Sequence, residues 1–265
     1  MTTAVRAPHL ADWALSHGRS ALTTAELARI LDVPSTHVSE RLSAPVTRGE
    51  WCLPARGLWV PVAPEYRAWG APPGLEILDA LARHIGIDYY VGWLSAAQLL
   101  GVGHQSPQEL QVAVSRQVRD RQVGRTRFVF RLRGGVDQAP VVQRETRAGT
   151  VRVSSPEATA LDLARDVHVG GGLGNVATVL VELDEAGAID HAVLAEVARH
   201  YPAATARRLG WLLENVGGSD ELDALLEVAA AGAPTLARLD PAHDLVGPAD
   251  NRWRVRVNGS VEADL

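Results

Sequence analysis

Residue types that commonly carry out catalysis are present in this chain, but they are scattered. Nine histidines occur, yet none lies in a His-Glu-x-x-His pattern or beside carboxylates at metal-ligand spacing. Cys52 is the single cysteine, so neither an intrachain disulfide nor a cysteine-based metal site is available. The sequence therefore predicts no metal site and no cofactor.

Two further segments contain residue types found in catalytic or phosphate-binding sites, but the residues around them do not match such sites. Ser154 and Ser155 lack a Gly-x-Ser-x-Gly frame, so we interpret them as helix caps rather than nucleophiles. The glycine run at residues 170–174 resembles a phosphate-binding loop only in its glycine content. It lacks the lysine of such a loop and no strong strand precedes it, so a connection between two helices is the simpler interpretation.

Glu157 and Asp162 are an acidic pair that a metal-dependent nuclease could use. Nucleases built on sheets often hold their metal with acids on neighbouring strands, beside an acid-x-lysine segment. This chain contains no lysine, which argues against that arrangement. We therefore expect no enzyme, with a nuclease using these two acids kept as an alternative.

All the basic charge comes from arginine, whose planar fork suits phosphate and guanine contacts. The net charge is -5, but it is unevenly distributed. Residues 116–152 carry +7 (ten arginines, three acids), whereas residues 153–265 carry -10 (eight arginines, eighteen acids). The split predicts different partners for different regions, although a solvated surface is the simpler interpretation of any single charge.

The arginines of the middle region form a second candidate surface for nucleic acid or a partner. They could extend a DNA contact along the backbone, or hold RNA or an acidic surface. The alternative is that they protect edge strands from aggregation. The group consists of Arg116, Arg119, Arg121, Arg125, Arg127, Arg131 and Arg133.

Length and composition indicate a globular chain of two or three small domains. It has 265 residues, of which 46% are hydrophobic and 22% charged. No apolar run approaches the roughly 20 residues of a membrane helix, and the first residues lack a secretory signal pattern. We therefore expect a soluble cytoplasmic protein without membrane contact.

The hydrophobic pattern predicts an α+β fold in three parts. Residues 1–70 read as a winged helix-turn-helix domain, residues 71–154 as a small mixed α/β region, and residues 155–265 as a mainly helical bundle. A capping box at Ser154 and Glu157 begins the helical part, and alternation over residues 252–257 predicts a final strand.

The first part contains two short helices across a tight turn. Thr23 and Glu26 form a capping box before a helix at residues 25–31. A second helix, from Ser35 or Thr36 to residue 43, would be anchored by Val38 and Leu42, which lie four apart on one face. This arrangement is the helix-turn-helix unit, whose second helix enters the major groove.

Two apolar strands then flank a turn at Arg56-Gly57, which predicts a wing. Arg48 and Arg56 would lie near the phosphates of a bound duplex. The net charge of residues 1–70 is only +1 (seven arginines, six acids), so a protein-interaction module is the alternative. The expected DNA-contacting residues are Ser35, Thr36, His37, Ser39, Glu40, Arg41, Arg48 and Arg56.

Several segments resemble AbiEi-type antitoxins, the repressor halves of abortive-infection toxin–antitoxin pairs. The segments are Thr24-Ala-Glu-Leu-Ala28, Arg48-Gly-Glu-Trp51, Arg56-Gly-Leu-Trp-Val60, Tyr89-Tyr-Val-Gly-Trp-Leu-Ser-Ala-Ala97, Ser154-Ser-Pro-Glu-Ala-Thr-Ala-Leu-Asp162 and Trp253-Arg-Val-Arg-Val-Asn258. The resemblance implies autorepression through binding to repeats in the protein's own promoter. It also implies a C-terminal part that counters a nucleotidyltransferase-type toxin by a route that needs no tight complex.

The only site role that the resemblance implies is DNA contact by the second helix and the wing, at residues 35–43, Arg48 and Arg56. The second helix is expected to end early, at Ala44-Pro45, and this early end departs from the family pattern. The resulting hypothesis is a DNA-binding autorepressor and antitoxin whose partners are double-stranded DNA and a cognate toxin. A nuclease targeted by the winged helix and a protein-binding adaptor are the alternatives.

Overall fold

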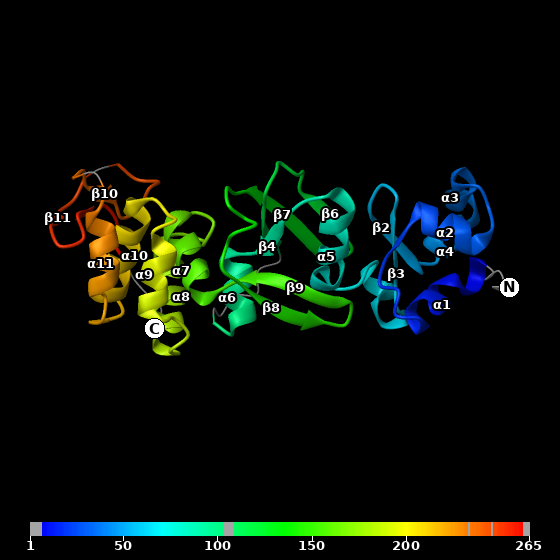
Figure 1. Ribbon diagram of the computed structural model, residues 1–265, viewed down its shortest axis with the longest axis horizontal. Helices are drawn as coiled ribbons and strands as arrows, with labels where there is room; N and C mark the ends of the chain where they lie inside the picture. The colour runs from blue at the N-terminus through cyan, green and yellow to red at the C-terminus, as the bar shows by residue number, and fades with distance from the viewer. Residues whose placement is uncertain (1–6, 103–108, 233, 245, 262–265) are drawn as a thin grey trace. The chain divides into compact units, whose positions relative to one another are not determined.

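The computed structural model describes residues 7–102, 109–232, 234–244 and 246–261, and it has a mixed α+β fold (Figure 1). The chain divides into two compact units. One comprises Met1–Tyr90, Gln108–Asp137 and Gln143–Arg152, and the other comprises Val91–Pro107, Gln138–Val142 and Val153–Leu265. The three-part division expected from the sequence stays a prediction.

The N-terminal part of the first unit consists of short helices around a three-stranded sheet (Figure 1). Leu10, Leu27, Val38, Leu42 and Trp51 form its core, each at most 2% exposed. The sheet order is β1-β3-β2. The elements are α1 (Leu10–Ser16), β1 (Leu22–Thr23), α2 (Thr24–Leu31), η2 (Ser35–His37), α3 (Val38–Arg41), α4 (Ser43–Thr47), β2 (Trp51–Ala55), β3 (Leu58–Pro61) and η3 (Pro64–Trp69).

The capping box expected at the start of α2 is confirmed. The Thr23 hydroxyl accepts a hydrogen bond from the Glu26 backbone N–H at 3.2 Å, and the Glu26 carboxylate accepts one from the Thr23 N–H at 2.7 Å. Burial opposes ionisation of Glu26, but these bonds and the Arg19 guanidinium outweigh it, so the pKa of Glu26 is lowered. The box therefore fixes the first turn of α2.

The second helix is less regular than expected. Instead of one helix over residues 35–43, the chain forms the 3-10 turn η2, the single α turn α3, and then α4, which runs to Thr47. Pro45 has no N–H to donate to the carbonyl of Arg41, so the helix is interrupted near Leu42. The helical path resumes when the Val46 N–H donates to the Leu42 carbonyl at 2.9 Å.

A six-stranded sheet follows, with the order β6-β7-β5-β4-β9-β8. β5 and β7 pair in parallel, and β6 pairs antiparallel with β7. Phe128 and Phe130 are buried in β7 as expected, but Leu132 at its end is 59% exposed. The elements are α5 (Gly74–Ile85), β4 (Tyr89–Val91), α6 (Trp93–Leu100), β5 (Glu109–Val114), β6 (Arg121–Val123), β7 (Thr126–Leu132), β8 (Val141–Thr146) and β9 (Gly149–Ser154).

The remainder of the second unit is a set of helices with a small sheet of order β10-β12-β11 (Figure 1). Residues from Glu157 to Ala164 in α7 are all buried, because α6, α8, α9 and α10 pack around that helix. The elements are α7 (Pro156–Arg165), α8 (Leu173–Glu185), α9 (His191–Ala198), α10 (Ala203–Asn215), α11 (Asp223–Ala230), β10 (Ala237–Arg238), β11 (Ala249–Asp250) and β12 (Val255–Arg256).

The expected final strand is shorter than residues 252–257, because Arg254 adopts a positive φ of 52° and only Val255–Arg256 form β12. Trp253 is nevertheless completely buried, and its Nε1–H donates to Glu214 at 2.6 Å. A Cβ atom on Gly210 of α10 would lie 2.1 Å from the Trp253 ring. The ring therefore packs directly on the α10 backbone, and glycine is the residue that fits there.

Arg208 of α10 is a second buried residue that joins elements of the second unit. It is 6% exposed, and its guanidinium donates to the backbone carbonyls of Ala164, near the end of α7, and Arg238. Burial lowers the pKa of Arg208 to about 10, although Asp240 and Asp166 oppose the shift. No helix in the described ranges is long and apolar enough to cross a membrane.

Candidate nucleic-acid interface

The polar face expected to contact DNA lies at the surface. η2 and α3 keep Val38 and Leu42 fully buried against the core, so the intervening side chains point outward. Arg41 supplies the cation of this face, and no described residue forms an ion pair with it. The exposed members are Ser35, Thr36, His37, Ser39, Glu40 and Arg41.

Arg48 is less available than expected, because it forms a bidentate ion pair with Glu50. Its Nε lies 2.7 Å from one carboxylate oxygen and its Nη2 lies 3.0 Å from the other. The hydrogen bonds from Arg48 outweigh burial and lower the pKa of Glu50. The charge of Arg48 is therefore offset before any phosphate approaches.

The turn of the β2–β3 hairpin is fixed by hydrogen bonds to its backbone carbonyls, whereas the Arg56 side chain is exposed. The His84 Nε2 lies 3.0 Å from the Arg56 carbonyl and donates to it in the tautomer protonated at that nitrogen. The Thr24 N–H donates to the Gly57 carbonyl at 3.0 Å. The hairpin is thus a fixed part of the first unit rather than a projecting ribbon, and no local sequence signal pointed to His84.

The seven arginines of the middle region do not form one free surface. Arg133 is only 8% exposed, so its assignment to a surface was wrong. Arg116 donates to the carbonyl of Gly86 at the end of α5. Arg121 donates to the Pro54 carbonyl in β2 at 3.0 Å, and burial lowers the pKa of its guanidinium. Arg116 and Arg121 therefore link segments of the first unit that are far apart in the sequence, because each donates to a backbone carbonyl.

The other members are engaged to different degrees. The Arg125 guanidinium lies 5.1 Å from the centre of the Trp69 ring, within cation–π range. Arg127 pairs with Glu109 across β5 and β7 at 3.2 Å. Arg116, Arg119, Arg125 and Arg127 are exposed, whereas Arg121 and Arg131 are half-buried.

The two acids kept for a nuclease are part of the internal packing of the second unit. Asp162 is fully buried and accepts a hydrogen bond from the Tyr201 hydroxyl at 2.9 Å. Glu157 is 7% exposed and accepts from the Ser155 hydroxyl and the Asp190 N–H. Among the described residues, no group of three or more His, Cys, Asp or Glu side chains could hold a metal ion.

The serine pair before α7 has a structural role, but the capping box expected between Ser154 and Glu157 does not form. Ser155, not Ser154, caps α7 and accepts from the Ala158 N–H at 3.3 Å. The Ser154 hydroxyl, which is fully buried, instead lies 2.7 Å from the Thr159 hydroxyl and donates to the Val91 carbonyl. The prediction was wrong because Pro156 fits the first helical position, so the residue before it is the cap and Glu157 does not stand at the third helical position.

Comparison with known proteins relates the central part of the chain to one family. Residues 90–215, from β4 to the end of α10, match the model of the AbiEi antitoxin C-terminal domain. This match agrees with the family resemblance seen in the sequence, and it supports an antitoxin role. No curated protein matches the chain.

A solved structure shares the fold over nearly the whole chain. The crystal structure of the RV2827C protein from Mycobacterium tuberculosis superposes with a TM-score of 0.68. The match covers 96% of this chain and 93% of that chain, at 17% sequence identity. At this identity the likeness carries the fold and nothing finer.

Proposed function

We propose that this protein is an antitoxin that represses its own transcription by binding double-stranded DNA through an N-terminal winged helix-turn-helix. The observation that carries the proposal is the exposed polar face from Ser35 to Arg41, held by Val38 and Leu42 in the core. Such short hydroxyl, imidazole and guanidinium groups can reach base edges and phosphates in a major groove about 12 Å wide. The DNA that we propose as its partner is the promoter of the protein's own gene.

The two arginines best placed for contact are Arg41 and Arg56. Both side chains are exposed, whereas Arg48 is already paired with Glu50. Each free arginine that neutralises a phosphate releases a counterion, so binding weakens as salt rises. Because the domain carries few such groups, we expect moderate affinity and a shallow salt dependence.

The toxin side of the proposal depends on the AbiEi domain. Its family assignment implies a cognate toxin, which we propose is a nucleotidyltransferase. Co-expression with a candidate nucleotidyltransferase toxin measures this activity as recovered growth. Variants of Arg41 should still restore growth if the DNA-binding face and the antitoxin domain act separately.

A gel-shift titration with the upstream promoter tests DNA binding. We expect a clear preference over a random duplex of equal length at moderate salt. Arg41→Ala should weaken binding roughly 10- to 100-fold if Arg41 contacts a base, and Arg56→Ala should reduce the salt slope by about one. Arg199→Ala, which removes an exposed arginine at the end of α9, is the matched control. Equal binding of promoter and random duplex contradicts the proposal.

A further inference from the structure

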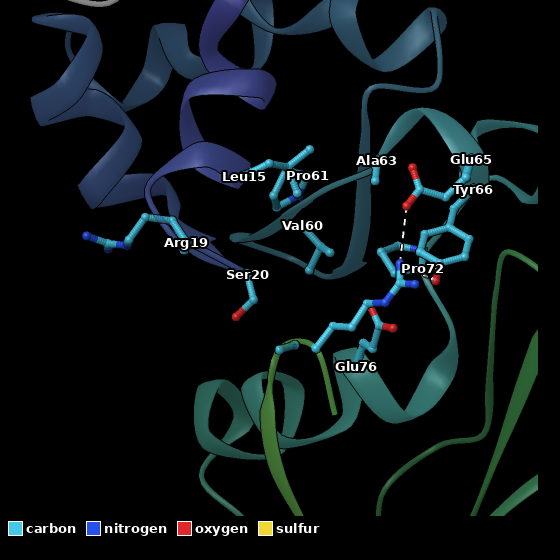
Figure 2. Close-up of a pocket in the computed structure, with 13 residues that line it drawn as sticks. Leu15, Arg19, Ser20, Val60, Pro61, Ala63, Glu65, Tyr66, Pro72 and Glu76 are labelled. Carbon is cyan, nitrogen blue, oxygen red and sulfur yellow. Dashed lines mark hydrogen bonds and ion pairs between the residues drawn. The ribbon is translucent and has the colours of Figure 1, made fainter. Parts of the chain in front are cut away.

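A cavity of about 140 Å³ lies in the first unit, between α1 and β3 on one side and η3, α5 and the β8–β9 turn on the other. Figure 2 shows Leu15, Val60 and Pro61 gathered on one side, with Glu65 and Tyr66 across from them and Glu76 below. The apolar side includes Leu15, which is 36% exposed although it is a large hydrophobic residue. The cavity therefore offers one hydrocarbon side and one charged side.

The charged side has an excess of negative charge. Arg147 from the β8–β9 turn lies 3.2 Å from the Glu65 carboxylate and also donates to the Tyr66 hydroxyl at 3.2 Å. Glu76 stands in the first turn of α5, and among the described residues no side chain forms a hydrogen bond or ion pair with its carboxylate. One guanidinium thus faces two carboxylates.

The electrostatic surroundings of Glu76 agree with this count. Burial raises the pKa of the Glu76 carboxyl, Arg147 partly offsets the effect, and the nearby Glu65 adds to it. The remaining arginine at the cavity, Arg19, is already paired with Glu26 at 2.5 Å. A second cation beside Glu76 would balance the charge, whereas an anion would meet unpaired carboxylate.

We propose that this cavity binds a small primary amine attached to a hydrocarbon group. The ammonium group lies beside Glu76, and the hydrocarbon part covers the apolar side formed by Leu15, Val60 and Pro61. The size of the cavity matches a single ring with a short arm, and such sites combine apolar walls with a few placed polar groups. This site is separate from the face proposed for DNA.

Calorimetric titration of the full chain with benzylamine tests the site. Benzylamine should bind with a Kd on the order of 1 mM, a value typical of so small a ligand. Benzyl alcohol has the same shape without the charge, and benzoate carries the opposite charge, so both should bind at least about tenfold more weakly. Equal binding of benzylamine and benzyl alcohol would overturn the proposal.

Variants locate the binding. Glu76→Gln keeps the shape of the side chain and should weaken benzylamine binding about tenfold, whereas Glu185→Gln, an exposed acid in α8, should leave it unchanged. Binding should also weaken in acid, because protonated Glu76 no longer attracts an ammonium group, and the raised pKa of Glu76 should start this loss at a higher pH than an ordinary carboxyl with a pKa of 4.5 would. If Glu76→Gln binds benzylamine as wild type does, the site is not this cavity.

A filling variant gives a second, independent measurement. Ala63 lines the cavity with φ -62° and ψ 150°, a conformation that leucine adopts without strain. Ala63→Leu should abolish benzylamine binding while the thermal unfolding midpoint stays near that of wild type. Undiminished binding in this folded variant would also overturn the proposal.

Discussion

Two segments of similar composition have opposite positions in this molecule. The segment from Ser35 to Arg41 and the segment from Ser154 to Asp162 both contain hydroxyl groups and acids around a few apolar residues. In the first, every polar side chain is exposed and only Val38 is buried. In the second, nearly every side chain is buried, and Ser154, Glu157 and Asp162 form hydrogen bonds with other parts of the second unit.

The difference shows that residue type alone does not identify a functional site. Buried polar groups must find hydrogen-bond partners, so the side chains of Ser154 and Asp162 are already engaged in hydrogen bonds within the protein. Exposed groups such as Ser39 and Arg41 are solvated and can exchange water for a partner at little cost. Among the residues considered for chemistry, the exposed segment is therefore the better candidate for an interface.

Of the variants that test this comparison, Asp162→Ala should have the largest effect. Removing the carboxylate leaves the Tyr201 hydroxyl without its 2.9 Å acceptor and opens a space in a fully buried site. We expect the free energy of unfolding to fall by about 3 kcal/mol. Urea denaturation, monitored by circular dichroism, measures this decrease in the free energy of unfolding.

Glu40→Ala is the control from the exposed segment. Its side chain is at the surface, so the free energy of unfolding should change by less than about 0.5 kcal/mol. Similar losses in Asp162→Ala and Glu40→Ala would show that the two segments do not differ as described.

A smaller effect is expected at the cap that precedes the exposed segment. Thr23→Ala removes the hydroxyl that accepts from Glu26, and the free energy of unfolding should fall by about 1 kcal/mol. The lowered pKa of Glu26 means that its carboxylate stabilises the fold above the ordinary pKa of 4.5, and this stabilisation is lost as pH falls below that value. The gap between wild type and variant should therefore narrow in acid; a constant gap from pH 7 to pH 3 would argue against the box.

The smallest effect concerns Cys52, which is half-buried in β2. Burial raises the pKa of its thiol to about 12, so little thiolate exists at pH 8.5. Alkylation by iodoacetamide should be about a hundredfold or more slower in the folded chain than in urea. Stability should decline above about pH 9, because the unfolded chain then loses its thiol proton first. Equal alkylation rates would show that this part of β2 is open.

Features set by near neighbours were predictable from the sequence. The cap at Thr23, the anchors Val38 and Leu42, and the hairpin around Arg56-Gly57 depend on residues a few positions apart, and each is present. The polar face between the anchors followed from helical spacing alone. The family resemblance reached further, because it rested on motifs spread along the chain.

Features set by distant neighbours were not predictable in this way. Arg121 bonds to Pro54, 67 positions away, and His84 bonds to the turn at Arg56, 28 positions away. The buried Asp162 and Trp253 likewise form hydrogen bonds with residues 39 positions away, Tyr201 and Glu214. A single sequence records which groups can form hydrogen bonds, but only the packed chain decides which of them meet, because burial removes water and obliges each polar group to find its partner within the protein.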